Sequence, residues 1–163
     1  MWSARAPGPE GALRRYREGD LQALVRLFTD AVHRLAGGYY TADQLAAWAQ
    51  PPDLNGWAAR LASLETLVAE IDGELAGFIA YEADGHIDLL YTSPAYCGRG
   101  VAAALFRQAE AELARRGITE LYTEASLAAR GFFEHRGFRV VEEQQVQRNG
   151  VVLQRYAMRR SVD

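Results

Sequence analysis

The stretch from His86 to Gly117 constrains the fold of this chain most. It contains an apolar strand (HIDLLYT), a turn (SPAYC), two glycines in GRG, and a helix that begins at Val101. Glycines at a strand-to-helix junction let backbone N–H groups converge on an anion. The helix N-terminus adds unpaired donors and about half a positive charge. This stretch therefore predicts a binding site for a pyrophosphate group.

The spacing of the loop discriminates between phosphate-binding motifs. A P-loop requires Lys and Ser or Thr directly after its last glycine, whereas Gly100 is followed by Val101 and two alanines. A dinucleotide fingerprint requires G-x-G-x-x-G directly after the strand, whereas here SPAYC intervenes and Ala103 replaces the last glycine. ATP and GTP are disfavoured, and a dinucleotide-binding oxidoreductase remains a remote alternative.

Length and composition fit one compact domain. The chain has 163 residues, of which 49% are hydrophobic and 24% charged, so it can bury a core of its own. Residues 1–11 are rich in Pro, Gly and Ala and are expected to form a flexible arm, and residues 12–163 a single domain. A net charge of -3 argues against a nucleic-acid partner, which would require an excess of basic residues.

The cysteine and histidine content and the pattern of apolar residues disfavour disulfide-bonded, metal-binding, secreted and membrane-spanning proteins. One Cys and three scattered His give neither an internal disulfide nor the spacing of a metal site. The N-terminus lacks the apolar segment of a signal peptide, and no apolar run is long enough to span a membrane. We therefore expect a cytoplasmic protein without a membrane partner.

Apolar periodicity predicts the N-terminal elements. A strand at 12–20 should end at Asp20, which we expect to cap a helix that stops at the glycine pair 37–38. Thr41 should cap a second helix, broken at Pro51–Pro52, and a third short helix should carry Trp57. These helices carry several aromatic side chains, which are expected either to pack in the core or to form a wall of the substrate pocket.

Strand patterns dominate the rest of the chain. Residues 66–92 predict three antiparallel strands, with a tight turn at Asp72–Gly73. After the helix, ITELYTEA should return parallel to HIDLLYT through a right-handed crossover. The last two strands should form a hairpin around Asn149–Gly150.

Two motifs carry a resemblance to a known family. The string LLYTSPAYCGRGVAAAL resembles the coenzyme A segment of the GNAT superfamily of N-acetyltransferases, in which Gln/Arg-x-x-Gly-x-Gly/Ala follows a strand. Cys97 stands where the family has Gln or Arg. The second family signature, Phe-Tyr-Glu-x-x-Gly-Phe, is matched by Phe132, Phe133, Glu134, Gly137 and Phe138. The resemblance extends from Leu13 to Met158.

The resemblance implies a fold, a co-substrate and a set of binding residues. The fold would be α/β (α+β): a mixed sheet of about seven strands with an antiparallel N-terminal meander, a splayed parallel pair, a C-terminal hairpin and about four helices. Acetyl-CoA would be the co-substrate, with no metal, and its acetyl group would pass directly to a primary amine of a small molecule or peptide. The residues implied to hold acetyl-CoA are Leu90, Tyr91, Thr92, Cys97, Gly98, Arg99, Gly100, Val101, Ala102, Ser126 and Phe133.

A catalytic base must remove a proton from the amine, which is mostly charged at neutral pH. The candidates are Glu124, Asp88 and Glu82, and we favour Glu124 because some family members place their base near this position. His86 is a less favoured candidate for the base, because a histidine that begins a strand is expected to be solvated. His33 is expected to lie on a helix surface, with the acceptor cavity as the alternative.

The catalytic acid is less well specified. Phe133 replaces the tyrosine that commonly protonates the leaving thiolate in the family, and a phenyl ring cannot donate a proton. Either Tyr91, Tyr122 or another hydroxyl substitutes, or the thiolate leaves unassisted. Ala128 replaces a frequent Asn, with Ser126 the nearest polar residue. These departures keep a second hypothesis open, a catalytically degenerate module that binds acyl-CoA as a sensor.

The nature of the acceptor and the oligomeric state stay open at this level. The net charge of -3 slightly favours cationic acceptors through electrostatic steering. Because dimers are common in the family and the last hairpin offers strand edges for pairing, the resemblance also allows a homodimer. Covalent catalysis by Cys97 is disfavoured, since this position faces phosphate in the family.

Overall fold

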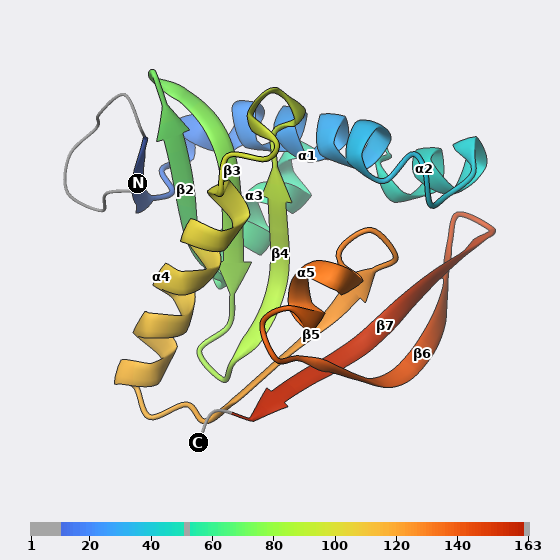
Figure 1. Ribbon diagram of the computed structural model, residues 1–163. Helices are drawn as coiled ribbons and strands as arrows, with labels where there is room; N and C mark the ends of the chain where they lie inside the picture. The colour runs from blue at the N-terminus through green and yellow to red at the C-terminus, as the bar shows by residue number, and fades with distance from the viewer. Residues whose placement is uncertain (1–10, 51–52, 162–163) are drawn as a thin grey trace.

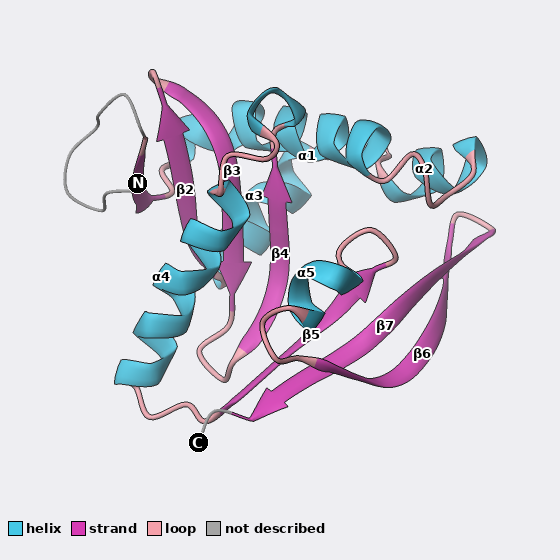
Figure 2. Ribbon diagram, in the orientation of Figure 1, coloured by secondary structure: helices cyan, strands magenta, loops and turns pink. Residues whose placement is uncertain are grey.

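The computed structural model describes residues 11–50 and 53–161, so the predicted arm at 1–11, apart from Gly11, and the break at Pro51–Pro52 lie outside the described residues. Seven strands form one mixed sheet in the order β1-β2-β3-β4-β5-β7-β6 (Figures 1 and 2). The strands are β1 (Ala12–Arg15), β2 (Glu65–Ile71), β3 (Glu74–Tyr81), β4 (His86–Thr92), β5 (Glu120–Ser126), β6 (Arg139–Arg148) and β7 (Val151–Ser161).

Helices cover both faces of the sheet. In Figure 1, α4 and α5 lie in front of the sheet and α1 and α3 behind it. Strand alternation sends Val68, Phe78 and Ala80 into the core beneath α1, and Leu67 and Ile79 into the core beneath α4. The α-helices of the described residues are α1 (Leu21–Leu35), α2 (Ala42–Trp48), α3 (Leu54–Ser63), α4 (Val101–Arg115) and α5 (Arg130–Glu134), one more than the four expected.

Most predicted elements and turns are confirmed. Both hairpin turns have the two successive left-handed residues of a tight turn: Asp72 and Gly73 have φ of 52° and 79°, and Asn149 and Gly150 have φ of 52° and 78°. The Thr41 hydroxyl accepts a hydrogen bond from the Gln44 amide and begins α2 as predicted. The first three strands after the N-terminal helices form an antiparallel meander, which excludes a doubly wound dinucleotide-binding fold.

The predicted cap at Asp20 is wrong. The strand ends at Arg15, and Asp20 closes a short 3-10 turn (Glu18–Asp20) whose helical backbone runs directly into α1. The Asp20 carboxylate accepts from the Arg14 guanidinium at 2.8 Å and from the Arg17 amide at 2.8 Å, so it is not available to the first turn of α1. The ion pair between Asp20 and Arg14 of β1 therefore replaces the helix cap that was expected of Asp20.

Gly77 sets the distance between α4 and the sheet. A Cβ atom at this position would lie 2.6 Å from Val101 Cγ1 and 2.9 Å from the Tyr91 carbonyl oxygen. We expect Gly77→Ala to lower the free energy of unfolding by about 1–3 kcal/mol, because the backbone oxygen cannot move aside. Chemical denaturation measures this loss. Gly38→Ala, where a Cβ would have no neighbour within 4 Å, is the control and should change stability by about 0.5 kcal/mol or less; equal effects of both variants would contradict the packing argument.

Candidate active site

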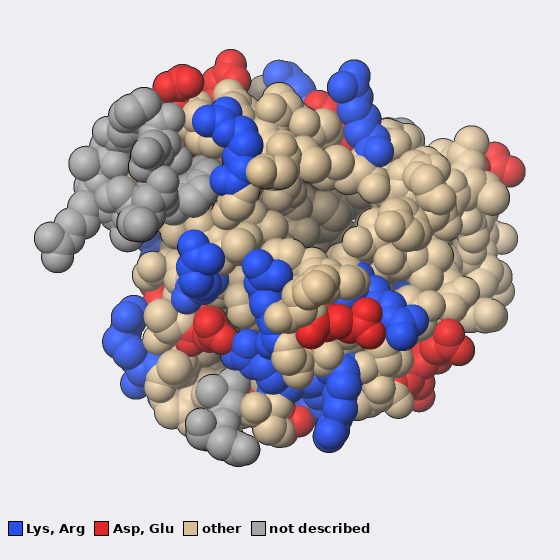
Figure 3. All heavy atoms as spheres, viewed as in Figure 1, with Lys and Arg blue, Asp and Glu red and all other residues tan. Residues whose placement is uncertain are grey.

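A cleft of about 470 Å³ opens where the two parallel strands diverge. β4 and β5 pair only at His86 with Tyr122 and Ile87 with Thr123, and the Thr123 hydroxyl donates to the Ile87 carbonyl oxygen at 2.8 Å at the point of divergence. Beyond Ile87, β4 continues to Thr92 with β3 as its ladder partner. The cleft is bordered by residues of α1, α2, α3, β4, β5, α5 and the β6–β7 hairpin, and Figure 3 shows the hollow near the centre of this face.

The glycine loop lies past the end of β4, outside the residues that line the cleft. Gly98 and Gly100 have φ of 80° and 79°, a conformation that only glycine adopts readily. Gly100 begins α4 without a side-chain cap. Within the described residues, the amides of Gly98, Gly100, Val101 and Ala102 form no hydrogen bond. The loop therefore presents a group of backbone donors at a helix N-terminus, an arrangement suited to an anion.

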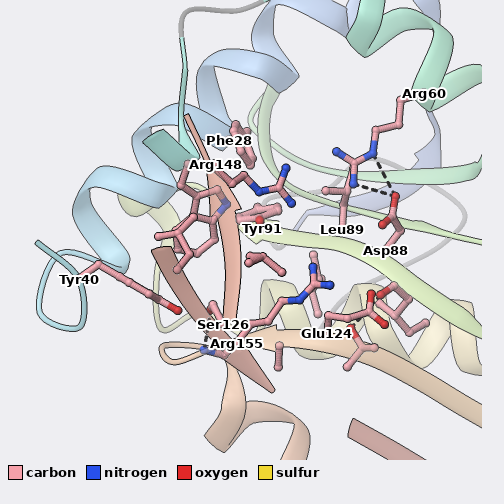
Figure 4. Close-up of a pocket in the computed structure, with 18 of the residues that line it drawn as sticks. Phe28, Tyr40, Arg60, Asp88, Leu89, Tyr91, Glu124, Ser126, Arg148 and Arg155 are labelled. Atoms are coloured by element: carbon pink, nitrogen blue, oxygen red, sulfur yellow. Dashed lines mark hydrogen bonds and ion pairs between the residues drawn. The ribbon is translucent and has the colours of Figure 1, made fainter. Parts of the chain in front are cut away.

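All three predicted catalytic residues, Glu124, Asp88 and Tyr91, line the cleft (Figure 4). The hydrogen bond from His86 lowers the pKa of Glu124, and the nearby charges of Arg155 and Arg159 add to this effect. Asp88 accepts from Arg60, with 3.1 Å to Nε and 3.0 Å to a terminal nitrogen. Glu124 thus lies between a histidine and the cavity, whereas Asp88 is held in an ion pair.

The expectation that His86 is solvated is wrong. Its side chain is 12% exposed and stacks on Tyr122 with 4.7 Å between ring centroids. Its Nε2 lies 2.7 Å from Glu124 Oε1 and its Nδ1 lies 2.7 Å from Glu82 Oε1. The hydrogen bond to Glu124, with a further contribution from Glu82, raises the pKa of His86 to about 9 against the effect of burial. At neutral pH an imidazolium therefore joins the cleft carboxylate to an exposed one.

The candidate hydroxyl groups differ in position. Tyr91 lies in the cleft, and burial raises its pKa to about 12. Tyr122 donates to Asp84 at 2.6 Å and does not line the cleft, so it is badly placed to act as an acid. The Ser126 hydroxyl lines the cleft and accepts from the Ala129 amide at 3.1 Å. Phe133 lines it too, and its ring packs against the phenylalanines of α4 and α5.

An aromatic wall faces the strands across the cleft. Phe28 packs on Trp57 and on Tyr91, with ring centroids 4.8 and 4.9 Å apart, and Tyr40 packs on Trp48 at 5.3 Å. Both tryptophans line the cavity and also contact the core beneath α1, so the two alternatives considered for them apply together. This wall provides apolar surface for the body of a ligand.

Two arginines that the sequence did not single out also line the cleft. Arg148 ends β6 and Arg155 lies on β7, on either side of the Asn149–Gly150 turn. Their guanidinium groups extend into the cavity in Figure 4. The strong turn motif was the available signal, because it sets the register in which Arg148 pairs with Val151 and Arg155 with Gln144.

Two further features concern metal ligation and membrane spanning in the described residues. Among the described residues, no cluster of three or more His, Cys, Asp or Glu is arranged to hold a metal ion. Within the same part of the chain, no helix combines the length and apolar composition that crossing a membrane requires.

Comparison with known proteins identifies relatives across nearly the whole chain. A family model described as an acetyltransferase (GNAT) domain matches residues 38–160. An uncharacterized N-acetyltransferase, YafP of Escherichia coli (strain K12), is 36% identical over 147 residues, covering 90% of this chain and 93% of the relative.

Solved structures share the fold. A GCN5-related N-acetyltransferase from Rhodopseudomonas palustris, which also carries the description aminotransferase class II, superposes with a TM-score of 0.89 at 34% identity, covering 93% of this chain and 95% of the other. The PaiA N-acetyltransferase of Thermoplasma acidophilum, solved in complex with coenzyme A, has a TM-score of 0.71 at 19% identity, covering 93% and 98%. At that identity the second likeness concerns the fold alone.

Proposed function

Because the chain belongs to the GNAT superfamily of N-acetyltransferases, we propose that it transfers the acetyl group of acetyl-CoA directly to a primary amine of a small molecule or peptide. One observation carries the proposal. β4 loses β5 as a neighbour after Ile87 and leads to a loop in which the amides of Gly98 and Gly100 form no hydrogen bond within the described residues. An extended molecule that ends in a diphosphate fits both features, since an open strand edge pairs with extended chains and a helix N-terminus binds phosphate.

The described residues fit acetyl-CoA in this way. The main chain from Leu90 to Thr92 forms the strand edge along the cleft, and the amides of Gly98 and Gly100 form the anion site. These donors belong to the backbone, so the Cys97 side chain in place of Gln or Arg leaves them intact. When bound, acetyl-CoA supplies an acetyl thioester that is reactive toward amines.

Glu124 and His86 together are proposed to receive the proton of the amine. A carboxylate beside an imidazolium is a weak base, but the same pair with a neutral imidazole binds a proton with an apparent pKa of about 9. This value is close to that of an aliphatic ammonium, about 10. Glu82, on the far side of His86, is 48% exposed and offers a route for the proton to solvent. The active form of the pair is therefore the one in which His86 is neutral.

A charge placed in the glycine loop tests cofactor binding. We expect Gly98→Asp to weaken acetyl-CoA binding by about tenfold or more, because a carboxylate near a diphosphate costs on the order of 1–4 kcal/mol. Isothermal titration calorimetry of the full chain with acetyl-CoA measures the change.

Gly73→Asp is the matched control. Gly73 has the same left-handed φ, 79° against 80°, and a Cβ at either position would have no neighbour within 4 Å. The two variants therefore carry the same backbone strain and the same added charge. Equal affinities for acetyl-CoA in both would contradict the anion site. Tight binding without turnover on a broad amine panel would instead favour the sensor hypothesis.

A further inference from the structure

The acidic residues of the cleft all have partners. Asp53 accepts from the Gly56 amide at 3.1 Å and begins α3. Asp88 is paired with Arg60, and Glu124 with His86. Asp88 and Glu124 thus each have a cationic partner in direct contact, and Asp53 caps a helix.

Arg148 and Arg155 are the two arginines of the cleft lining that form no salt bridge with a carboxylate of the described residues. Within the described residues, neither has a carboxylate oxygen within 4.0 Å. Arg155 Nε donates to the neutral Gln144 Oε1 at 2.8 Å, which orients the side chain without cancelling its charge. The lining holds three arginines and three carboxylates, but Arg148 and Arg155 lack a carboxylate partner, so positive charge is exposed to a ligand on the β6–β7 side of the cleft. At contact distances these local charges dominate over the net charge of -3 of the whole chain, because that charge is distributed and screened.

The strands that carry these arginines are held against α2. Gln44 Nε2 donates to the Val152 carbonyl oxygen at 3.0 Å, and the Tyr40 hydroxyl donates to the Gln154 carbonyl oxygen at 2.8 Å. The Leu127 amide donates to the same Tyr40 hydroxyl at 2.8 Å, which links the segment before α2 to the residue after β5. These contacts fix the backbone on which the two guanidinium groups face the cavity (Figure 4).

A guanidinium binds carboxylate or phosphate oxygens through paired, charge-assisted hydrogen bonds. Phe28, Trp48 and Trp57 also line the cleft and provide apolar surface. We propose that the acceptor is an amine that also carries an anionic oxygen group and an apolar body, with Arg148 and Arg155 binding the anion. An aromatic amino acid has this chemistry. The inference rests on the proposed function and names the substrate class of the same cleft.

Matched amines test the charge preference. The probes are phenylalanine, its aminophosphonate analogue and phenylalaninamide, which share the amine and the aromatic body and differ in the oxygen group. We expect kcat/KM with acetyl-CoA, and affinity by calorimetry, to favour an anionic probe over the amide by about 10- to 100-fold. Comparison of the carboxylate with the phosphonate then identifies which oxyanion is preferred.

Variants assign the preference to the arginines. We expect Arg155→Gln and Arg148→Gln each to reduce the preference for an anionic probe over the amide by about tenfold or more, while the affinity for acetyl-CoA stays the same. Arg139→Gln, an exposed arginine of β6 outside the cleft lining, is the control and should leave it unchanged. The proposal is overturned if the anionic probes bind no better than the amide, including the case in which neither binds, or if the variants weaken acetyl-CoA instead. Failure to bind acetyl-CoA would contradict the proposed function. It would leave the test of the substrate class intact, because calorimetry measures the affinities of the three probes without turnover.

Discussion

Replacing Glu124 with glutamine is expected to lower kcat/KM by about 100- to 10,000-fold, the range that loss of a positioned general base produces. The side chain keeps its size and loses only its basicity, at a site where it lies 2.7 Å from His86 Nε2 and faces the cleft. Coenzyme A release can be followed with an arylamine acceptor that is uncharged across the pH range, so that ionisation of the acceptor does not contribute. Acetyl-CoA affinity should stay unchanged.

The pH profile distinguishes a chemical role of Glu124 from a structural one. In the unmodified chain, kcat/KM should rise about tenfold per pH unit and level off above about pH 9, the pKa of His86 in the pair. Glu124 makes the largest contribution to that raised pKa, so in Glu124→Gln the residual activity should level off at a lower pH.

Glu82→Gln is the matched control, because Glu82 contacts the other nitrogen of the same histidine and is exposed. This variant should also lower the pH at which activity levels off, but its kcat/KM should fall only a few fold. Equal losses in the two variants would show that the carboxylates act only through His86. A large loss in Asp88→Asn with little change in Glu124→Gln would identify Asp88 as the base.

The fold was predictable wherever short-range chemistry determines the structure. Asp72–Gly73 and Asn149–Gly150 are pairs that tolerate left-handed backbone, and both form the expected hairpins. The glycines of the loop and the apolar periodicity of α4 also determine local structure, the turn before the helix and the helix itself. The splayed strands followed from the family resemblance and are confirmed by the two paired positions between β4 and β5.

The wrong or missing assignments concern charged side chains. Arg14 draws Asp20 away from the helix it was expected to cap, and His86 pairs with Glu124, which is 38 residues further along the chain. Arg148 and Arg155 enter the cleft because the hairpin docks on α2. Each outcome depends on how elements pack in three dimensions, and a charged side chain has no periodicity that reveals its partner in advance.

His86→Gln is expected to lower the free energy of unfolding by about 2–3 kcal/mol at pH 6. Folding raises the pKa of His86 from 6.5 to about 9, so the folded state binds its proton more tightly than the unfolded chain does. The stabilisation is therefore complete below about pH 6.5, declines as the pH rises further, and is lost above about pH 9. Urea denaturation of both proteins between pH 6 and pH 10 measures the difference.

His33→Gln provides the control for this pH dependence. His33 lies exposed on α1, so its replacement should change stability by about 0.5 kcal/mol or less at every pH. A stability difference between the unmodified chain and His86→Gln that stays constant from pH 6 to pH 10 would mean that the ring contributes by packing on Tyr122 rather than by its charge. A difference that disappears near pH 9 would show that the proton shared with Glu124 and Glu82 stabilises this end of the β4–β5 pair, the same proton that the proposed base must release before it can act.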